Sequence, residues 1–210
     1  MLYQLIQYIG IVSILPGAIL AAINYKRLHI KALRILAMLA FYNVVWELIS
    51  MITSIGFVVN NSMLVGIHSS GELLLIALYF TQSLTTKQFR PLFISVSIIL
   101  TIAMAANLCF EPGIFPAKAR AAQALAIVIF SIYGFFVWLK SYDQRIYELY
   151  VILAFLIYFS ACTITFYYSD VMPPDWARII WFFHDIVNIA SNLLILFAFI
   201  NYLYRHGKKL

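Results

Sequence analysis

Seven long apolar runs decide what this chain can fold into. About 20 consecutive apolar residues are needed to carry an α-helix across roughly 30 Å of membrane hydrocarbon. Strands are excluded, because a strand of a membrane barrel has about 10 residues of alternating polarity. The sequence therefore predicts an all-α, integral membrane bundle of seven transmembrane helices. The runs, separated by short polar segments, span residues 3–24, 32–58, 63–83, 92–110, 121–139, 146–168 and 177–203.

The composition agrees with a chain that faces lipid over most of its surface. Of the 210 residues, 64% are hydrophobic and only 10% are charged, whereas a soluble domain carries about 25% charged residues. The seven runs use nearly the whole length, so we expect one seven-helix domain over residues 1–210, with the lipid bilayer as its main partner. The formal net charge of +6 does not predict a nucleic-acid partner, because the basic residues stand in short loops between apolar runs.

The basic residues also predict the orientation of the chain. Short loops rich in Lys and Arg stay in the cytoplasm, and eleven of the 14 such residues fall on one side of the predicted bundle. These eleven are Lys26, Arg27, Lys31, Arg34, Lys87, Arg90, Lys140, Arg145, Arg205, Lys208 and Lys209. The other side receives the remaining three, Lys118, Arg120 and Arg178, as loop residues. We therefore expect a multi-pass protein of the cell (cytoplasmic) membrane, with its N-terminus outside and its C-terminus in the cytoplasm.

Five ionisable side chains lie well inside three of the apolar runs. Glu47 is in the second run, His68 and Glu72 are in the third, and His184 and Asp185 are in the seventh. A charged side chain at bilayer depth costs at least about 2.5 kcal/mol on insertion scales, so each one calls for a partner or a function. Counted along the helices, all five lie near the midplane or in the outer half, and the fourth and fifth runs contain none.

The helical spacing predicts that these side chains share one site with two asparagines. Residues four apart lie on the same helix face, which joins Asn43 to Glu47 and His68 to Glu72. His184, Asp185 and Asn188 fall within about a third of a helix circumference. The predicted ligand-binding set is Asn43, Glu47, His68, Glu72, His184, Asp185 and Asn188. The structural alternative is that these residues are interhelical hydrogen-bonding staples.

Histidine beside carboxylates titrates near neutral pH, shuttles protons or coordinates metals. A divalent metal such as zinc is one candidate cofactor, with His68, Glu72, His184 and Asp185 as its ligands. A haem held between His68 and His184 is a further alternative. Without a metal or another cation, the cluster should exchange protons between about pH 5 and pH 8.

The layout of the helices resembles two groups of seven-helix membrane proteins. Over the whole chain, the helix order alone is similar to that of rhodopsins and other seven-helix receptors. Retinal is not implied, because rhodopsins attach it to a lysine in the seventh helix and residues 177–203 contain none. No motif specific to these receptors, or to the second group described below, is present in full.

The second group is the seven-helix membrane hydrolases that include alkaline ceramidases and adiponectin-type receptors. That resemblance implies zinc held by a histidine in helix 2, an aspartate in helix 3 and an H-x-x-x-H pair in helix 7. This chain has Asn43-x3-Glu47, His68-x3-Glu72 and His184-x3-Asn188 at those places. It therefore departs from the zinc motif at nearly every position.

Three functions remain open from the sequence. The first is a receptor- or sensor-like protein that binds a small ligand, ion or proton from the outer side. Its signal would pass to a partner in the membrane or the cytoplasm. The second is an intramembrane metal-dependent hydrolase of a lipid. The third is a small transporter, against which stands the absence of repeated halves.

Overall fold

The structure is a computed structural model that describes residues 2–56, 61–83, 89–110, 116–141, 145–169 and 171–206. Every regular element within these ranges is a helix, as the sequence predicts. The elements in chain order are α1 (Leu2–Ser13), α2 (Leu15–Ile23), the short 3-10 helix η1 (Tyr25–Arg27), α3 (Lys31–Gly56), α4 (Asn61–Ser83), α5 (Arg90–Phe110), α6 (Ala117–Lys140), α7 (Ile146–Tyr168) and α8 (Pro174–His206).

The first apolar run forms two helices rather than one. Helix α1 ends at Ser13 and α2 begins at Leu15, with Pro16 in the first turn of α2. Proline lacks the N–H that an α-helix needs, and its ring collides with the carbonyl group four residues earlier. This proline accounts for the interruption of the helix at Ile14.

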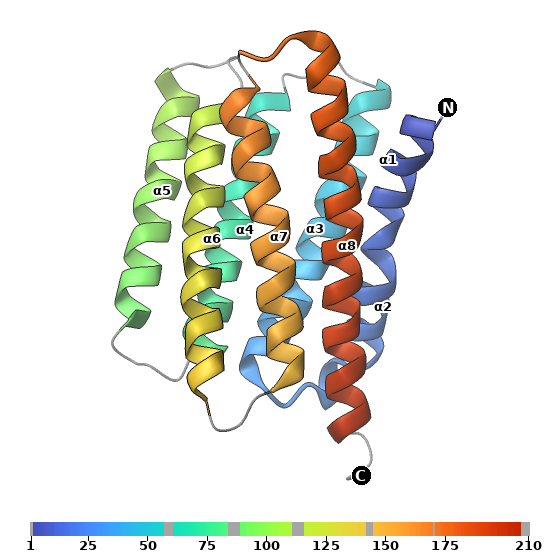
Figure 1. Cartoon of the computed structure of the whole chain (residues 1–210), viewed down its shortest axis with the longest axis vertical. Helices are drawn as coiled ribbons and strands as arrows, with labels where there is room; N and C mark the ends of the chain where they lie inside the picture. The colour runs from blue at the N-terminus through green and yellow to red at the C-terminus, as the bar shows by residue number, and fades with distance from the viewer. Residues whose placement is uncertain are drawn as a thin grey trace.

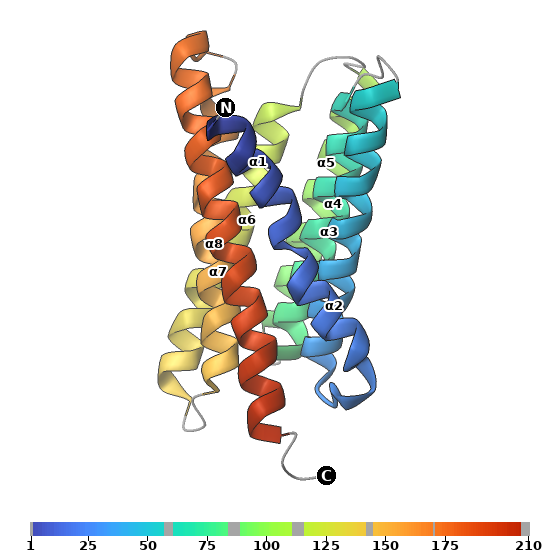
Figure 2. The same cartoon turned by 90° about the vertical axis from the view of Figure 1, so that its right-hand side faces the viewer.

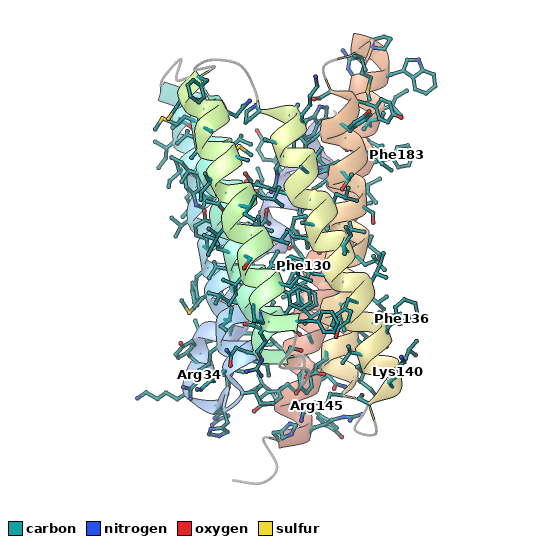
Figure 3. All side chains as sticks on the ribbon, turned by 90° about the vertical axis from the view of Figure 1, so that its left-hand side faces the viewer. Arg34, Phe130, Phe136, Lys140, Arg145 and Phe183 are labelled. Atoms are coloured by element: carbon teal, nitrogen blue, oxygen red, sulfur yellow. The ribbon has the colours of Figure 1, made fainter. Side chains whose placement is uncertain are left out.

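Six of the helices are long and apolar enough to cross a membrane, namely α3 to α8. The broken first run contributes a shorter apolar stretch, Tyr8–Ile23. Large apolar side chains cover the outside of the bundle, and Phe136 and Phe183 project away from it while Phe130 is buried (Figure 3). An apolar exterior of this extent requires lipid rather than water, so the chain is a multi-pass membrane protein.

The helices stand side by side as one up-and-down bundle (Figure 1). Neighbours in the chain pack against each other from α3 to α8, and α8 also packs against both α1 and α2, which closes the ring. Helix α4 reaches α6 as well as α3 and α5. We call the end of the bundle that carries the N-terminus the N-side and the end that carries the C-terminus the C-side (Figure 2).

Two glycines let α4 and α6 approach their neighbours closely. A Cβ atom on Gly71 of α4 would overlap the ring and hydroxyl of Tyr42 from α3, and one on Gly134 of α6 would crowd Phe80 of α4. Small residues allow such close approach between membrane helices, where packing replaces much of the hydrophobic drive. These contacts fix α4 in the interior, next to both α3 and α6.

Candidate functional site

The most deeply placed charges of the bundle form an ion pair between α4 and α6. The guanidinium Nη2 of Arg120 donates a hydrogen bond of 2.8 Å to Oε2 of Glu72, and the two side chains are only 3% and 4% exposed. The Arg120 guanidinium also lies 5.9 Å and 5.4 Å from the ring centroids of Phe159 and Phe166 in α7. Cation–π contacts of this kind are strongest when the cation is desolvated.

This position corrects the assignment of Arg120 to an outer loop. Helix α6 begins at Ala117, directly after Pro116, and therefore includes Arg120 at the end of its first turn. The predicted run begins at residue 121, because arginine lowers the local hydropathy and is typical of a loop. Alanines flank Arg120 at 119, 121 and 122, and these small residues are a signal for a tightly packed helix that composition alone passes over.

Beside Glu72, five helices enclose a polar cavity of about 50 Å³. A water molecule needs roughly 10–15 Å³ of such space, so the cavity has room for only a few waters or a small polar group. Its polar wall consists of Asn43, Glu47, His68, Glu72, Tyr158, Asn188, Ser191 and Asn192, and its apolar wall of Gly10, Ile14, Leu39, Phe155, Phe159 and Ile195.

Glu47 differs from Glu72 although both carboxylates line the same cavity. Glu72 is paired with Arg120, whereas Glu47 makes no side-chain hydrogen bond or ion pair with any residue in the described part of the chain. Asp185 and Glu72 act on it electrostatically with one sign and His184 with the opposite sign. Glu47 is therefore a cavity carboxylate without a direct cationic partner among the described residues.

His68 is held firmly at the edge of the cavity. Its Nε2 lies 3.2 Å from Oδ1 of Asn43, and because an amide oxygen only accepts, Nε2 carries the hydrogen. Tyr42 stacks on the imidazole at 5.5 Å and Trp46 lies against it at the same centroid distance. The Tyr42 hydroxyl donates to the backbone carbonyl of His68 at 3.0 Å. These contacts lock α3 to α4 around the histidine.

The opposite wall of the cavity is a hydrogen-bonded set of small polar side chains. The Asn192 amide donates to Oγ of Ser13 at 2.8 Å and to Oδ1 of Asn188 at 3.3 Å. Ser191 donates to the carbonyl oxygen of Ala154 in α7. These bonds join α8 to α1 and α7. The side-chain oxygen of Asn188 accepts one of them.

His184 and Asp185 lie apart from this wall. Nε2 of His184 is 3.3 Å from Sγ of Cys162 in α7, and its Nδ1 is 3.8 Å from Oδ1 of Asp185. The imidazole is surrounded by the rings of Tyr158, Phe166 and Trp181. Neither residue lines the cavity.

The structure thus brings together five of the seven residues of the predicted site: Asn43, Glu47, His68, Glu72 and Asn188. The four proposed metal ligands do not meet as one group: His184 and Asp185 are neighbours, but His68 contacts Asn43 and Glu72 pairs with Arg120. Across the described ranges, no three His, Cys, Asp or Glu side chains are gathered in a way that could hold a metal ion. The metal set of His68, Glu72, His184 and Asp185 stays a prediction that this geometry does not support.

Sequence reasoning missed Arg120 and the Cys162–His184 contact. Arg120 supplies the positive charge that pairs with Glu72, and Cys162 of α7 contacts the imidazole of His184. No protein-family model, curated protein or solved structure matches this chain. The function is therefore argued from the cavity itself.

Proposed function

We propose that the chain is a receptor- or sensor-like protein of the cell membrane whose polar cavity takes a small cation or a proton from outside. In this proposal the chain crosses the membrane seven times, with the broken pair α1 and α2 as the first span. The N-terminus lies outside and the C-terminus in the cytoplasm.

The distribution of basic residues supports this orientation. Arg34, Lys140 and Arg145 all lie at the C-side end of the bundle (Figure 3). With Arg120 paired inside the bundle, Lys118 and Arg178 remain as the N-side basic residues of the described ranges, against eight on the C-side. Because cytoplasmic loops are enriched in Lys and Arg, the correction at Arg120 increases the asymmetry.

The observation that carries the functional proposal is the contrast between Glu47 and Glu72. A partly buried carboxylate at membrane depth without a partner is costly, and the cost is removed by a proton or by a bound cation. Glu72 already has Arg120 as its counter-charge. Glu47 has none among the described residues, so the cavity lacks one positive charge, and a ligand or a proton supplies it.

The two alternative functions have less support. A metal-dependent hydrolase needs several ligands around one ion with an open position for water, and the candidate ligands are engaged elsewhere. A transporter would use the same carboxylate, but it would also carry the cation across the membrane. A measurement of cation flux across the membrane distinguishes a transporter from a sensor.

The test uses methylammonium chloride as the cationic probe and purified protein in lipid nanodiscs. A ligand that binds only the folded state raises its stability by mass action. We expect methylammonium to raise the thermal unfolding temperature of the wild type above that in sodium chloride at equal ionic strength, and to have no such effect on Glu47→Gln. Glu148→Gln, which changes a carboxylate near the C-side end of α7, is the matched control and keeps the response.

Two outcomes would overturn the proposal. An equal response in wild type and Glu47→Gln removes Glu47 as the cation site. Uptake of methylammonium into sealed vesicles that contain the protein, lost in Glu47→Gln, identifies a transporter instead of a sensor.

A further inference from the structure

A second cavity adjoins the first on the same face of α3 and α4. It has a volume of about 140 Å³ and is lined by Trp46, Glu47, Ile49, Ser50, Leu64, Val65 and His68. We call it the upper cavity, because its other residues lie one to two helical turns nearer the N-side than Asn43 and Glu72 of the lower one. Both cavities share Glu47 and His68. The carboxylate therefore stands where a small polar cavity meets a larger and more apolar one.

The surroundings of Glu47 do not suit a bare metal cation. Hard cations such as Ca²⁺ take six to eight oxygen ligands. Two amide oxygens of the lower cavity already accept a hydrogen bond, Oδ1 of Asn43 from His68 and Oδ1 of Asn188 from Asn192. Glu72 is neutralised by Arg120. One free carboxylate remains, which suits a cation that brings its own N–H donors.

The upper cavity supplies what the organic part of such a cation would need. Trp46 presents an indole next to the carboxylate, and indole is the best aromatic partner for an ammonium group. Ile49, Leu64 and Val65 add an apolar lining. The indole is itself steadied by its contacts with Tyr42 and His68.

We propose, as an inference that rests on the function proposed above, that the ligand is an organic ammonium ion with a short apolar body. Its ammonium group binds the Glu47 carboxylate at the junction of the two cavities. Its apolar body lies in the upper cavity against Trp46, Leu64 and Val65. A body in that place adds binding free energy that a bare methylammonium cannot gain.

The experiment compares three probes on the wild-type protein in nanodiscs by isothermal titration calorimetry. Phenethylammonium has the charge and the body, methylammonium has the charge alone, and 2-phenylethanol has the body without the charge. We expect phenethylammonium to bind at least about tenfold more tightly than methylammonium, because burying an apolar body of this size favours binding by that order. The alcohol should bind more weakly than phenethylammonium, because it leaves the carboxylate unpaired.

Two variants test where the body lies. Val65→Phe fills the upper cavity and should reduce phenethylammonium affinity to that of methylammonium while methylammonium affinity stays within about twofold. Val45→Phe adds the same ring at a position that is 52% exposed on α3 and should change neither affinity. Should Val65→Phe fold poorly, Trp46→Leu removes the aromatic wall of the upper cavity and should weaken the binding of phenethylammonium more than that of methylammonium, because only phenethylammonium also loses the contact of its apolar body.

The outcomes distinguish a failure of this inference from a failure of the proposed function. If methylammonium binds to the wild type but not to Glu47→Gln, and phenethylammonium binds no more tightly, the function stands and the organic ligand is wrong. Tight phenethylammonium binding that survives both Val65→Phe and Trp46→Leu refutes the placement. If neither cation binds, the proposed function fails as well.

Discussion

Arg120 of α6 and Glu72 of α4 are joined by a 2.8 Å ion pair that is almost entirely out of contact with solvent. The pair removes the charge of one of the two cavity carboxylates and leaves the other, Glu47, as the group that a ligand must satisfy. Removing one partner of such a buried pair strands the other charge, whereas removing both does not.

The first prediction follows from that asymmetry. Arg120→Met should lower the free energy of unfolding by about 3 to 5 kcal/mol, because the Glu72 carboxylate is left buried and uncompensated. The double variant Glu72→Gln with Arg120→Met should be more stable than Arg120→Met alone. Both are measured by unfolding in SDS mixed micelles. Equal stability of the single and double variants would show that the pair does not form.

The second prediction concerns the close contact between α3 and α4. Gly71→Ala should destabilise the protein by about 1 to 3 kcal/mol, because the new methyl group overlaps the Tyr42 ring and its hydroxyl. Gly17→Ala is the matched control, since a Cβ there would meet its nearest atoms at 4.0 Å and alanine favours the helix. The same unfolding assay checks both, and a tolerated Gly71→Ala would contradict the packing of α4 on α3.

The third prediction concerns the different reactivities of the two cysteines. Cys109 is exposed and Cys162 is buried against His184, and both are free thiols. A membrane-permeant maleimide should therefore label Cys109 in the folded protein and reach Cys162 only after unfolding. Mass spectrometry of the peptides gives the result directly. Labelling of Cys162 at a rate similar to that of Cys109 would contradict the burial of the α7–α8 contact.

The fourth prediction tests the orientation. In a Cys109→Ser background, Val171→Cys on the N-side should react with a membrane-impermeant maleimide applied to intact cells, because Val171 is 76% exposed. His29→Cys, in the exposed segment between α2 and α3, should react only after permeabilisation. The reverse pattern would place the N-terminus in the cytoplasm and close the proposed route of the ligand.

Much of the fold could be predicted from hydropathy, because a helix that crosses lipid must be long and apolar. The predicted run 146–168 coincides with α7, and α5 begins two residues before its prediction. Arg120 is a residue whose position hydropathy alone does not predict. A sum over hydropathy treats every arginine as a boundary, and only the three-dimensional packing reveals that a carboxylate 48 residues away neutralises it.

The candidate site could be predicted in part for a similar reason. Spacing along one helix groups Asn43 with Glu47 and His68 with Glu72, and these four residues line one cavity. It could not decide which edge of the wide polar stripe on α8 faces the cavity. In the structure Asn188 lines the cavity, whereas His184 contacts Cys162 of α7. The polar stripe of α8 therefore faces both the cavity and α7. Such a choice depends on α7, which contributes no charge to the predicted site.

The most direct test of the account is whether a cation and a proton compete for Glu47. If this carboxylate carries a proton when no cation is bound, methylammonium must displace that proton on binding. Addition of methylammonium to the wild-type protein in weakly buffered solution should then release protons, followed with a pH-indicator dye. Glu47→Gln should release none, whereas Glu148→Gln should match the wild type. Equal proton release from the wild type and Glu47→Gln would contradict the claim that the unpaired carboxylate in this cavity is the cation site.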